Sequence, residues 1–242
     1  KKVSNKVNLK SSIGRTYFNK SLYSKDKIKL NKIINNISFS IDKKKDTFHS
    51  FSKNFQFSFK HNELTKFKKY KSVVVIGMGG SVLGAKAIYS FCKNKIKKKF
   101  IFLDNLDQLK HEKIKKNINL KDCLFIIISK SGNTLETLVN SNLLKDKINN
   151  KNTIIITENK INLLNTFAKN KKILLVDHKD YIGGRYSVLS EVGILPAYLM
   201  GINTNAFRKK LLNFFEFKEK NLLIDNAIKL SHIYKYKKIN SI

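Results

Sequence analysis

Short apolar runs separated by helical patterns fill the middle of the chain. The runs are rich in Val, Ile, Leu and Phe and predict buried strands at residues 73–76, 99–103, 123–128, 153–157 and 172–176. Amphipathic spacing between them predicts helices at residues 81–95, 108–117, 134–147 and 161–170, with Asp and Asn near several starts as caps. Strands that alternate with helices of this length predict βαβ units, and therefore an α/β fold with a parallel sheet and helices on both faces. The strand order stays open, but ligands of such sheets bind at the carboxyl edge.

The segment before the first strand differs in composition from this central region. It is rich in Lys, Ser and Asn, and an apolar spacing predicts a helix over residues 20–36 that packs over the sheet as an amino-terminal flap. A series of phenylalanines follows, which fits core aromatics better than a short strand: Phe48, Phe51, Phe55, Phe57 and Phe59.

Along the chain, these patterns predict three parts. Residues 1–70 form a partly helical extension, residues 71–204 a central domain, and residues 205–242 the helical start of a truncated second domain. Near the end of the central domain an apolar helix is expected over residues 188–200. Pro196 lies within it and predicts a kink or an early helix end.

Length and composition indicate a globular protein. The chain has 242 residues, of which 42% are hydrophobic, enough for one good-sized domain with a real core. No apolar run approaches the roughly 18 residues of a membrane span, and no signal-type segment is present at the start, so we expect a soluble cytoplasmic protein without membrane partners. Cys92 and Cys123 are expected to be buried, reduced thiols rather than a disulfide or metal site.

The formal net charge of +32 would normally indicate nucleic-acid binding. Only three of the 49 basic residues are arginine, namely Arg15, Arg185 and Arg208, whereas base readout and phosphate clamping favour Arg. Abundant Lys, Asn and Ile are what an AT-rich coding sequence would supply. We therefore expect no specific nucleic-acid partner, although the positive field should attract anionic metabolites.

The first apolar run breaks into closely spaced glycines and a hydroxyl, Gly77-Met78-Gly79-Gly80-Ser81, before a helical pattern begins. Glycines let a backbone approach an anion and adopt positive φ, while the first free N–H groups of the following helix point at it. The pattern fits a phosphate-binding turn. On its own, it fits a plain connection between strand and helix equally well.

A second turn, rich in hydroxyl groups, follows the third run: Ser129-Lys130-Ser131-Gly132-Asn133-Thr134-Leu135-Glu136-Thr137. A capping box made by Asn133 or Thr134 with Glu136 or Thr137 would explain part of it. That interpretation leaves Ser129 and Ser131 unexplained. Because turns after parallel strands face the same edge of a sheet, the two turns together favour a phosphate site.

A third element lies after the fifth predicted strand, where Gly183 and Gly184 precede Arg185. A guanidinium on a loop that approaches closely is a fixed cation, which can hold negative charge that develops on a substrate oxygen. On the motif alone, an ordinary ion pair of Arg185 with Glu136 or Glu191 is equally well supported.

Together the three elements resemble the sugar isomerase (SIS) domain of the phosphoglucose isomerase family, also called the glucose-6-phosphate isomerase family. The glycine-rich turn is similar to the family's phosphate turn, and residues 129–137 are similar to its Ser-Lys-Thr-x-Thr-Thr-x-Glu-Thr loop. Residues 183–196 are similar to its Gly-Gly-Arg-x-Ser signature, which is the specific motif because SIS domains in general share only the first two. The resemblance spans roughly residues 73–201 and implies an SIS-type doubly wound, five-stranded parallel sheet.

The resemblance also implies roles for single residues. The sugar phosphate would be held by residues of the first two turns: Gly80, Ser81, Ser129, Lys130 through its backbone, Ser131 and Thr134. Arg185, next to Gly184 in the substrate site, would stabilise the enediolate, and Glu136 would shape the site rather than act as the base. The pair Gly132-Asn133 replaces the family's usual residues, as in other SIS proteins and in dual phosphoglucose/phosphomannose isomerases, so the preferred hexose stays open.

The implied activity is the interconversion of glucose 6-phosphate and fructose 6-phosphate through an enediol, in glycolysis and gluconeogenesis, without a metal or nucleotide cofactor. This chemistry needs a carboxylate base, a ring-opening acid and charge stabilisation, of which the chain supplies only the last. In the family the base glutamate, a histidine and a late lysine lie in the second half, so we expect a fragment of a longer protein that is a homodimer when complete. The alternative is a non-catalytic SIS module that binds a sugar phosphate and reports it to a partner.

The histidines are candidates by residue type only: His49, His61, His111, His178 and His232. His178 lies near the carboxyl edge of the fifth predicted strand and is the best placed to touch a substrate. A core or surface role is nevertheless favoured for it and for the others.

Overall fold

The computed structural model describes residues 20–209, 211 and 217–236 of the chain. These residues form two compact units, one of residues 44–208 and one in which residues 20–43 join those from 209 onward. Each unit is described by itself. The domain boundaries expected at residues 70 and 204 stay a prediction, although residues 44–70 group with the sheet in the structure.

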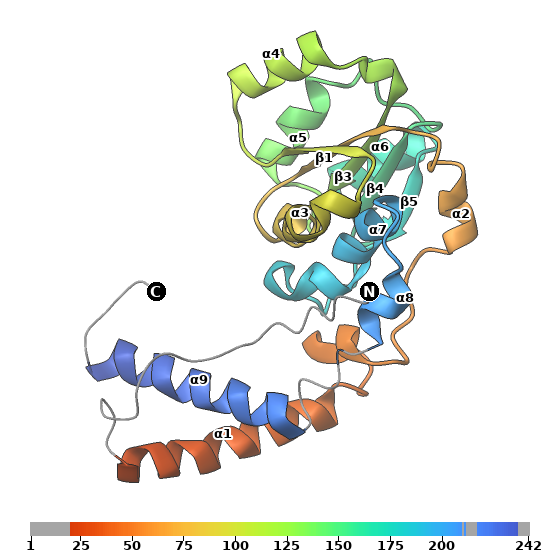
Figure 1. The fold of residues 1–242 in the computed structure, drawn as a ribbon. Coiled ribbons are helices and arrows are strands. Elements are labelled where there is room, and N and C mark those ends of the chain that lie inside the picture. The colour runs from red at the N-terminus through yellow and green to blue at the C-terminus, as the bar shows by residue number, and fades with distance from the viewer. Residues whose placement is uncertain (1–19, 210, 212–216, 237–242) are drawn as a thin grey trace, which may run out of the picture. The chain divides into compact units, whose positions relative to one another are not determined.

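The larger unit contains a five-stranded parallel sheet of order β2-β1-β3-β4-β5 (Figure 1). The strands lie within two residues of their expected bounds: β1 (Ser72–Gly77), β2 (Lys99–Leu103), β3 (Cys123–Ile128), β4 (Thr153–Thr157) and β5 (Leu174–Asp177). The chain passes from β1 to β2 on one side and then returns to β3 on the other, so the strand order reverses between β1 and β3. At such a reversal the loops diverge and open a crevice at the carboxyl edge, where doubly wound sheets bind ligands.

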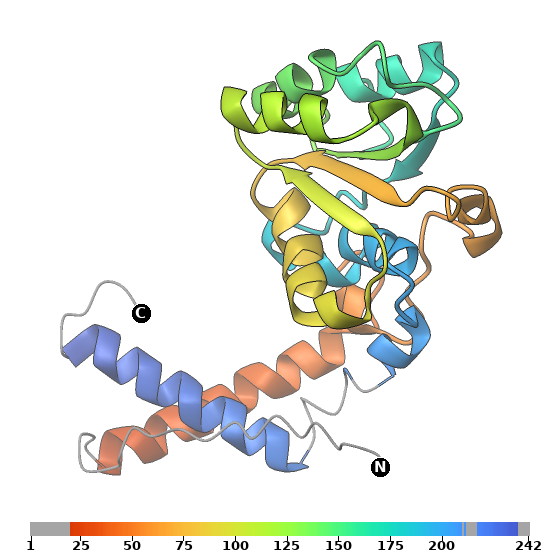
Figure 2. The ribbon, with the colours of Figure 1, turned by 45° about the horizontal axis from the view of Figure 1, so that its top comes forward.

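Helices cover both faces of the sheet (Figure 2). One face carries α4 (Gln108–Asn117), α5 (Leu135–Asn142) and α6 (Leu163–Asn170), and the other carries α3 (Gly80–Cys92) and α7 (Glu191–Leu199). Shorter helices connect these layers: η3 (Lys93–Lys95), η4 (Leu120–Asp122), η5 (Gly184–Leu189) and α8 (Thr204–Arg208). The predicted doubly wound α/β fold is thereby confirmed.

Several helices differ from their expected bounds. The first helix, α1 (Lys20–Ser40), continues beyond the expected residue 36, and α3 ends at Cys92 and is followed by the 3-10 helix η3. The helix expected to reach residue 147 ends at Asn142 and continues as turns. The helix α7 begins at Glu191 rather than at residue 188, because the preceding residues form the 3-10 helix η5. It continues through Pro196 to Leu199, so the early end expected at the proline is not found.

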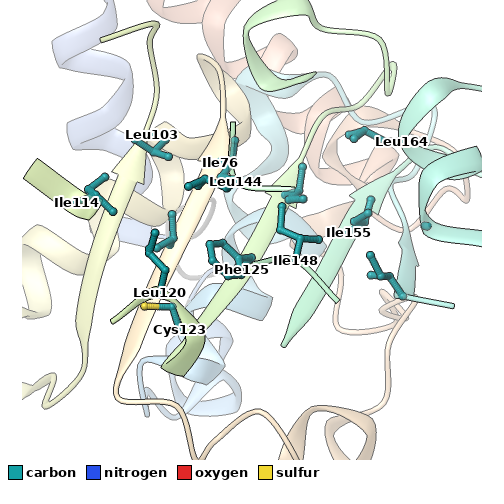
Figure 3. Packing of buried hydrophobic residues seen from close by; sticks show 14 residues of the cluster. Ile76, Leu103, Ile114, Leu120, Cys123, Phe125, Leu144, Ile148, Ile155 and Leu164 are labelled. Atoms are coloured by element: carbon teal, nitrogen blue, oxygen red, sulfur yellow. The ribbon is translucent and has the colours of Figure 1, made fainter. Parts of the chain in front are cut away.

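Alternate strand residues form a hydrophobic core beneath α4, α5 and α6 (Figure 3). The sheet contributes Ile76, Phe125 and Ile155 from three neighbouring strands, while Ile114 and Leu164 come from α4 and α6. Every residue of β3 is buried. An unbroken apolar run predicts this for a parallel strand that is covered on both faces.

The segment of residues 44–70 carries the expected phenylalanines without forming a strand. It contains η2 (Thr47–Phe51) and α2 (His61–Thr65). Between these helices Phe55 and Phe59 are buried, and Phe57 meets both rings at centroid distances of 5.3 and 5.1 Å. The interpretation as core aromatics is confirmed for Phe55 and Phe59, whereas Phe48, Phe51 and Phe57 are half-buried.

The smaller unit pairs two long helices, α1 (Lys20–Ser40) and α9 (Phe217–Tyr236). They pack through a small apolar cluster around Ile34, Ile224 and Ile228. The helix α1 therefore buries its apolar face against α9, which the sequence did not predict, and its packing over the sheet as a flap stays a prediction. Of the expected helices at the end of the chain, residues 212–216 and those beyond 236 lie outside the described residues.

Two expectations drawn from composition can be compared with the structure. Both cysteines are free, but only Cys123 is buried, whereas Cys92 is half-buried. Within the described ranges, no helix is both long enough and apolar enough to span a membrane.

Candidate functional site

The turn after β1 leads through glycines and Ser81 into α3. Gly79 is the N-cap of α3, with a φ of +50° that favours glycine, and no side chain caps this helix. Gly77, the last residue of β1, is in register with Ile128, the last residue of β3. The turn therefore begins directly beside the second candidate turn, with Ser81 half-buried in the first turn of α3.

Ser129 and Thr134 hold the turn after β3 together. Their hydroxyl oxygens lie 2.8 Å apart, and the N–H of Gly132 donates to Ser129 Oγ at 3.2 Å. Ser129 is only 2% exposed, whereas Ser131 is exposed. Thr134 is the N-cap residue of α5, but its hydroxyl is bonded to Ser129 rather than to an N–H group of the helix. The capping interpretation is therefore wrong for Thr134.

The helices α3 and α5 begin differently from the other helices that pack on the sheet. Side-chain oxygens of Asp107, Asn162 and Ser190 accept backbone N–H groups at the starts of α4, α6 and α7. No side chain does so for α3 or α5. The first N–H groups of a helix lack partners within the helix and carry the positive end of its dipole. Among the described residues, the two helices beside the reversal of strand order thus begin without a side-chain cap. At α3 the carbonyl oxygens of Met78 and Gly79 accept the N–H groups of Ser81 and Val82, both at 3.0 Å. Helix starts of this kind can bind an anion.

The glycine pair after β5 reaches the turn after β1. A Cβ placed on Gly80 would overlap the carbonyl group of Gly184 and lie 2.8 Å from its Cα, so the two backbones are in direct contact. Ser187 secures this contact, because its Oγ donates to the carbonyl oxygen of Gly184 at 2.7 Å and lies 3.3 Å from that of Gly80. Ser187 was not among the predicted site residues, although the Gly-Gly-Arg-x-Ser signature contains it.

Arg185 follows Gly184 and is exposed. The alternative interpretation was an ion pair with Glu136 or Glu191. Glu191 is fully buried, and Lys179 Nζ lies 4.0 Å from its Oε1. Among the described residues, neither glutamate forms an ion pair with Arg185, so its guanidinium is not engaged by the carboxylates that the alternative required.

The side chain of Lys130 connects the second turn to the loop after β5. Its Nζ donates to the carbonyl oxygen of Asp180 at 2.5 Å and lies 3.7 Å from Glu158 Oε1. Because the ammonium group is engaged in this way, only the backbone of Lys130 is suited to meet a phosphate. Glu136 is half-buried in the first turn of α5. Its expected role in shaping the site stays a prediction.

The pair Gly132-Asn133, which departs from the family pattern, attaches the second turn to α6. Gly132 has a φ of +70°, and a Cβ there would overlap the side-chain amide of Asn162. Asn133 Oδ1 accepts the N–H of Leu163 at 3.0 Å. The departure therefore has a structural explanation in the packing of the turn. Asn162 was not among the predicted site residues, and its only signal in the sequence is a polar residue near the start of a predicted helix.

His178 lies after β5 and is 2% exposed, with Nδ1 3.1 Å from the carbonyl oxygen of Lys179. Burial lowers the pKa of its imidazole below the usual value. The charge of Lys130, in the second turn, also acts on this imidazole, so His178 lies near the side chain of that lysine. Its burial fits the favoured core role. In the described part of the chain, no group of three or more His, Cys, Asp or Glu side chains is placed to hold a metal ion.

Comparison with known proteins places these motifs in a family. The phosphoglucose isomerase family model matches residues 12–216. The chain belongs to the phosphoglucose isomerase family. It is 38% identical over 148 residues to the glucose-6-phosphate isomerase of Methanocaldococcus jannaschii, a match that covers 58% of this chain and 36% of that protein. It is 41% identical over 141 residues to the glucose-6-phosphate isomerase of Borrelia garinii subsp. bavariensis, covering 52% of this chain and 26% of that enzyme.

Solved structures share the fold of this phosphoglucose isomerase family member. A hypothetical protein from Thermus thermophilus superposes with a TM-score of 0.72 at 21% identity, covering 87% of this chain and 54% of that one. A glucose-6-phosphate isomerase from Chlamydia trachomatis superposes with a TM-score of 0.52 at 28% identity, covering 61% of this chain and 29% of that enzyme. The chain thus spans about a third or less of the length of the curated relatives it matches.

Proposed function

We propose that this chain is the sugar-phosphate-binding part of a glucose-6-phosphate isomerase, which interconverts glucose 6-phosphate and fructose 6-phosphate through an enediol intermediate in glycolysis and gluconeogenesis. One observation carries the proposal: the two helices beside the reversal of strand order, α3 and α5, begin without side-chain caps, while the Arg185 loop packs against the start of α3. The family match and the names of the relatives support the same activity.

The phosphate group would sit between the starts of α3 and α5. Backbone N–H groups at both helix starts would donate to its oxygens, and the helix dipoles would favour its charge. Hydroxyl groups of Ser81, Ser131 and Thr134 would add hydrogen bonds at the same place. The buried Ser129 would act by holding Thr134, to which its hydroxyl is bonded. Binding of the non-reacting phosphate would fix the position of the sugar carbons, so that reacting groups meet them in one orientation.

Arg185 would act at the reacting end of the sugar. Enediolate formation places negative charge on a substrate oxygen, and a preorganised cation stabilises that charge more than it stabilises the neutral sugar. The contact of Gly184 with Gly80 fixes how far the Arg185 loop lies from the phosphate turn. The proton-transferring base and the ring-opening acid are expected from the remainder of the enzyme, as the family resemblance implies.

The surroundings of the site support its completion by another domain or subunit. Loops and first helical turns that follow the strands carry large apolar side chains that are more than half exposed: Leu83, Leu106, Leu109, Leu135, Ile161, Leu163 and Tyr186. Exposed apolar side chains of this kind around a site mark a protein interface. We infer that the complete enzyme covers this edge and is a homodimer; a cytoplasmic location and the absence of a specific nucleic-acid partner stay predictions.

A binding experiment tests the assignment of the phosphate site. The chain is titrated with 6-phosphogluconate, a sugar 6-phosphate that the enzyme does not isomerise, in isothermal calorimetry. Replacing both serines, as Ser81→Ala with Ser131→Ala, should weaken binding about tenfold or more, because hydrogen bonds to a charged group each contribute about 1.5–3 kcal/mol. Ser90→Ala is the matched control, since Ser90 lies on the same helix α3 but is exposed near its far end.

Three outcomes would contradict the proposal. Unchanged affinity in the double variant, or an equal loss in Ser90→Ala, would remove the phosphate site from the two turns. Binding without any isomerase activity in the full-length enzyme would instead favour the non-catalytic sugar-phosphate module. Comparison of glucose 6-phosphate with mannose 6-phosphate in that enzyme tests the dual specificity that Gly132-Asn133 left open.

A further inference from the structure

A cavity separate from the candidate sugar-phosphate site opens at the amino edge of the sheet. Its volume is about 360 Å³, and it is lined by Lys68, Lys95, Lys97, Lys98, Tyr198, Leu199, Met200 and Gly201. The lysines come from the segments just before β1 and β2, and the remaining residues come from the end of α7. The candidate sugar-phosphate site lies at the opposite ends of the same strands, about 17 Å away for a strand of this length at the usual rise of about 3.3 Å per residue.

The cavity brings like charges together without an opposite charge. None of its lining residues is acidic. Lys98 is half-buried, and its pKa is lowered, first by burial and then by repulsion from the neighbouring Lys68. Placing ammonium groups so close together costs free energy in the absence of an anion.

Two of the four lysines are held in place rather than free on the surface. Lys98 Nζ donates to the carbonyl oxygen of Lys68 at 2.8 Å. Lys68 Nζ lies 4.3 Å from the centre of the Tyr198 ring, and that ring is itself packed edge-on against His61 with centroids 4.5 Å apart. Half of the charge of the cavity is therefore carried by groups with fixed positions, while Lys95 and Lys97 are exposed at its rim.

The lysines are not needed to cap α7, whose carboxyl end also lies in the cavity. Cations are often found at such ends because they satisfy the last carbonyl groups and oppose the helix dipole. Here Gly201, with a φ of +86°, closes the helix in a Schellman motif. The N–H of Gly201 donates to the carbonyl oxygen of Tyr198 at 3.0 Å, and that of Ile202 donates to the carbonyl oxygen of Ala197 at 3.1 Å.

We propose that this cavity binds a condensed phosphate chain, either as free oligophosphate or as the phosphate tail of a nucleotide. Four ammonium groups around one cavity match a compact ligand with several negative charges, and lysine binds phosphate oxygens as a point charge. The volume lies in the range of small-molecule sites. The helix α7 begins after the Arg185 loop and its last residues, Tyr198 and Leu199, line this cavity, so α7 runs from the loop of one candidate site to the wall of the other.

Calorimetric titration with tripolyphosphate at constant ionic strength tests this inference. Lys95→Gln with Lys97→Gln should weaken binding about tenfold or more, through lost charge-assisted hydrogen bonds. Lys145→Gln with Lys169→Gln is the matched control, because it removes the same charge from two exposed lysines that do not line the cavity, and it should change affinity less than about twofold. ATP is titrated in parallel, and tighter binding of ATP than of tripolyphosphate would identify a nucleotide as the ligand.

Three results would overturn the inference. Equal losses of tripolyphosphate affinity in the two double lysine variants would mean that the ligand is attracted by the overall positive charge of the chain and not by this cavity. Tripolyphosphate binding that is lost in the Ser81→Ala, Ser131→Ala variant, and kept in the cavity variant, would place the probe at the sugar-phosphate site. Absence of saturable tripolyphosphate binding, with binding of duplex DNA instead, would indicate an extended basic surface. Binding of 6-phosphogluconate to the cavity variant shows independently whether the proposed function holds.

Discussion

Gly80 and Gly184, which are far apart in sequence, meet backbone to backbone at the carboxyl edge of the sheet. Gly80 begins α3 after the first turn, and Gly184 begins η5 directly before Arg185. The contact joins the proposed phosphate turn to the loop that carries the proposed cation. The absence of a side chain at Gly80 therefore sets the distance between the two ends of the proposed substrate site.

Gly80→Ala should destabilise the protein and weaken sugar-phosphate binding, because a Cβ there would overlap the backbone of Gly184, which cannot rotate away as a side chain can. Overpacking of this kind costs about 1–3 kcal/mol of unfolding free energy. Gly183→Ala is the control: its φ is −68°, and the added Cβ would meet only a ring atom of Tyr186 at an ordinary 3.5 Å. Urea unfolding of both variants checks the difference, and equal stability would contradict the close contact.

Arg185→Ala in the full-length enzyme should lower turnover while leaving the affinity for 6-phosphogluconate nearly unchanged. The reason is that the proposed role is exerted on charge that exists only in the transition state, and loss of one such group costs about 2.7–4 kcal/mol of barrier. Arg185→Lys should recover part of the rate, since it keeps the charge without the planar guanidinium. A variant that lost affinity but kept turnover would assign Arg185 to binding instead.

Gly132→Ala should destabilise the second turn for two reasons that can be separated. Gly132 has a φ of +70°, and a Cβ would also overlap the side chain of Asn162. Gly201→Ala shares only the first problem, because its φ is +86° and nothing lies within 4 Å of the added Cβ. Left-handed strain costs about 1–2 kcal/mol in both variants, and overpacking adds about 1–3 kcal/mol in Gly132→Ala alone. Equal unfolding midpoints would contradict the packing of this turn on α6.

The strands of this protein were predictable because burial on both faces leaves an unambiguous pattern. Each residue of β3 and β4 is buried, and both strands begin and end where the apolar run does. The start of β5 was expected two residues early, because Lys172 adopts a φ of +53° in the turn after α6. A lysine carries no sequence signal for that left-handed conformation, since Gly or Asn would usually be found there.

The assembly of the site could be predicted only in part. Parallel strands fix which edge the first two turns share, so Ser81 and Ser129 could be placed at one edge from the pattern alone. The strand order that makes these turns neighbours is a long-range property that one sequence does not contain. The contact of Gly80 with Gly184 and the hydrogen bond from Ser187 to the carbonyl oxygen of Gly80 are also long-range, so one sequence does not reveal them either.

Lys130→Met should lower the affinity for 6-phosphogluconate a few-fold by releasing the second turn from the loop after β5. Lys130 Nζ donates to the carbonyl oxygen of Asp180, and a hydrogen bond of a partly exposed charged group contributes roughly 1 kcal/mol. Lys160→Met is the control. It removes one positive charge that is paired with Glu158, as Lys130→Met does, but Lys160 forms no hydrogen bond to the Asp180 loop among the described residues. Calorimetry of both variants should find the larger loss for Lys130→Met. Equal losses of affinity in the two variants would mean that the effect comes from the lost positive charge alone and not from the hydrogen bond to Asp180.

Glu191 should make the stability of the protein fall as pH rises. Its side chain is fully buried; Oε1 accepts the N–H of Ser58 at 2.9 Å, while Oε2 has no hydrogen-bond partner among the described residues. Burial raises the pKa of the carboxyl group, against the opposing effects of Ser58 and Lys179. Arg208, whose pKa is lowered by burial, and Tyr181 also interact with this carboxylate.

The sign follows from proton linkage. Below the ordinary glutamate pKa of about 4.3, both the folded and the unfolded chain carry the proton. Above it, the unfolded chain loses its proton first, so the folded state binds more protons and the free energy of unfolding decreases with pH until the raised folded-state pKa is passed. Glu191→Gln removes this titration and should gain stability over the wild type as pH increases from about 4 to about 8.

Urea unfolding of wild type and Glu191→Gln across this pH range measures the difference directly. Glu112→Gln is the control, because Glu112 is exposed on α4 and its replacement should leave the pH dependence unchanged. Since Glu191 begins α7 directly after the Arg185 loop and Ser190, the same titration in the full-length enzyme reports whether protonation of Glu191 affects turnover as well. A wild type that gains stability over Glu191→Gln with rising pH would mean that Lys179 and Arg208 stabilise the carboxylate more than burial destabilises it.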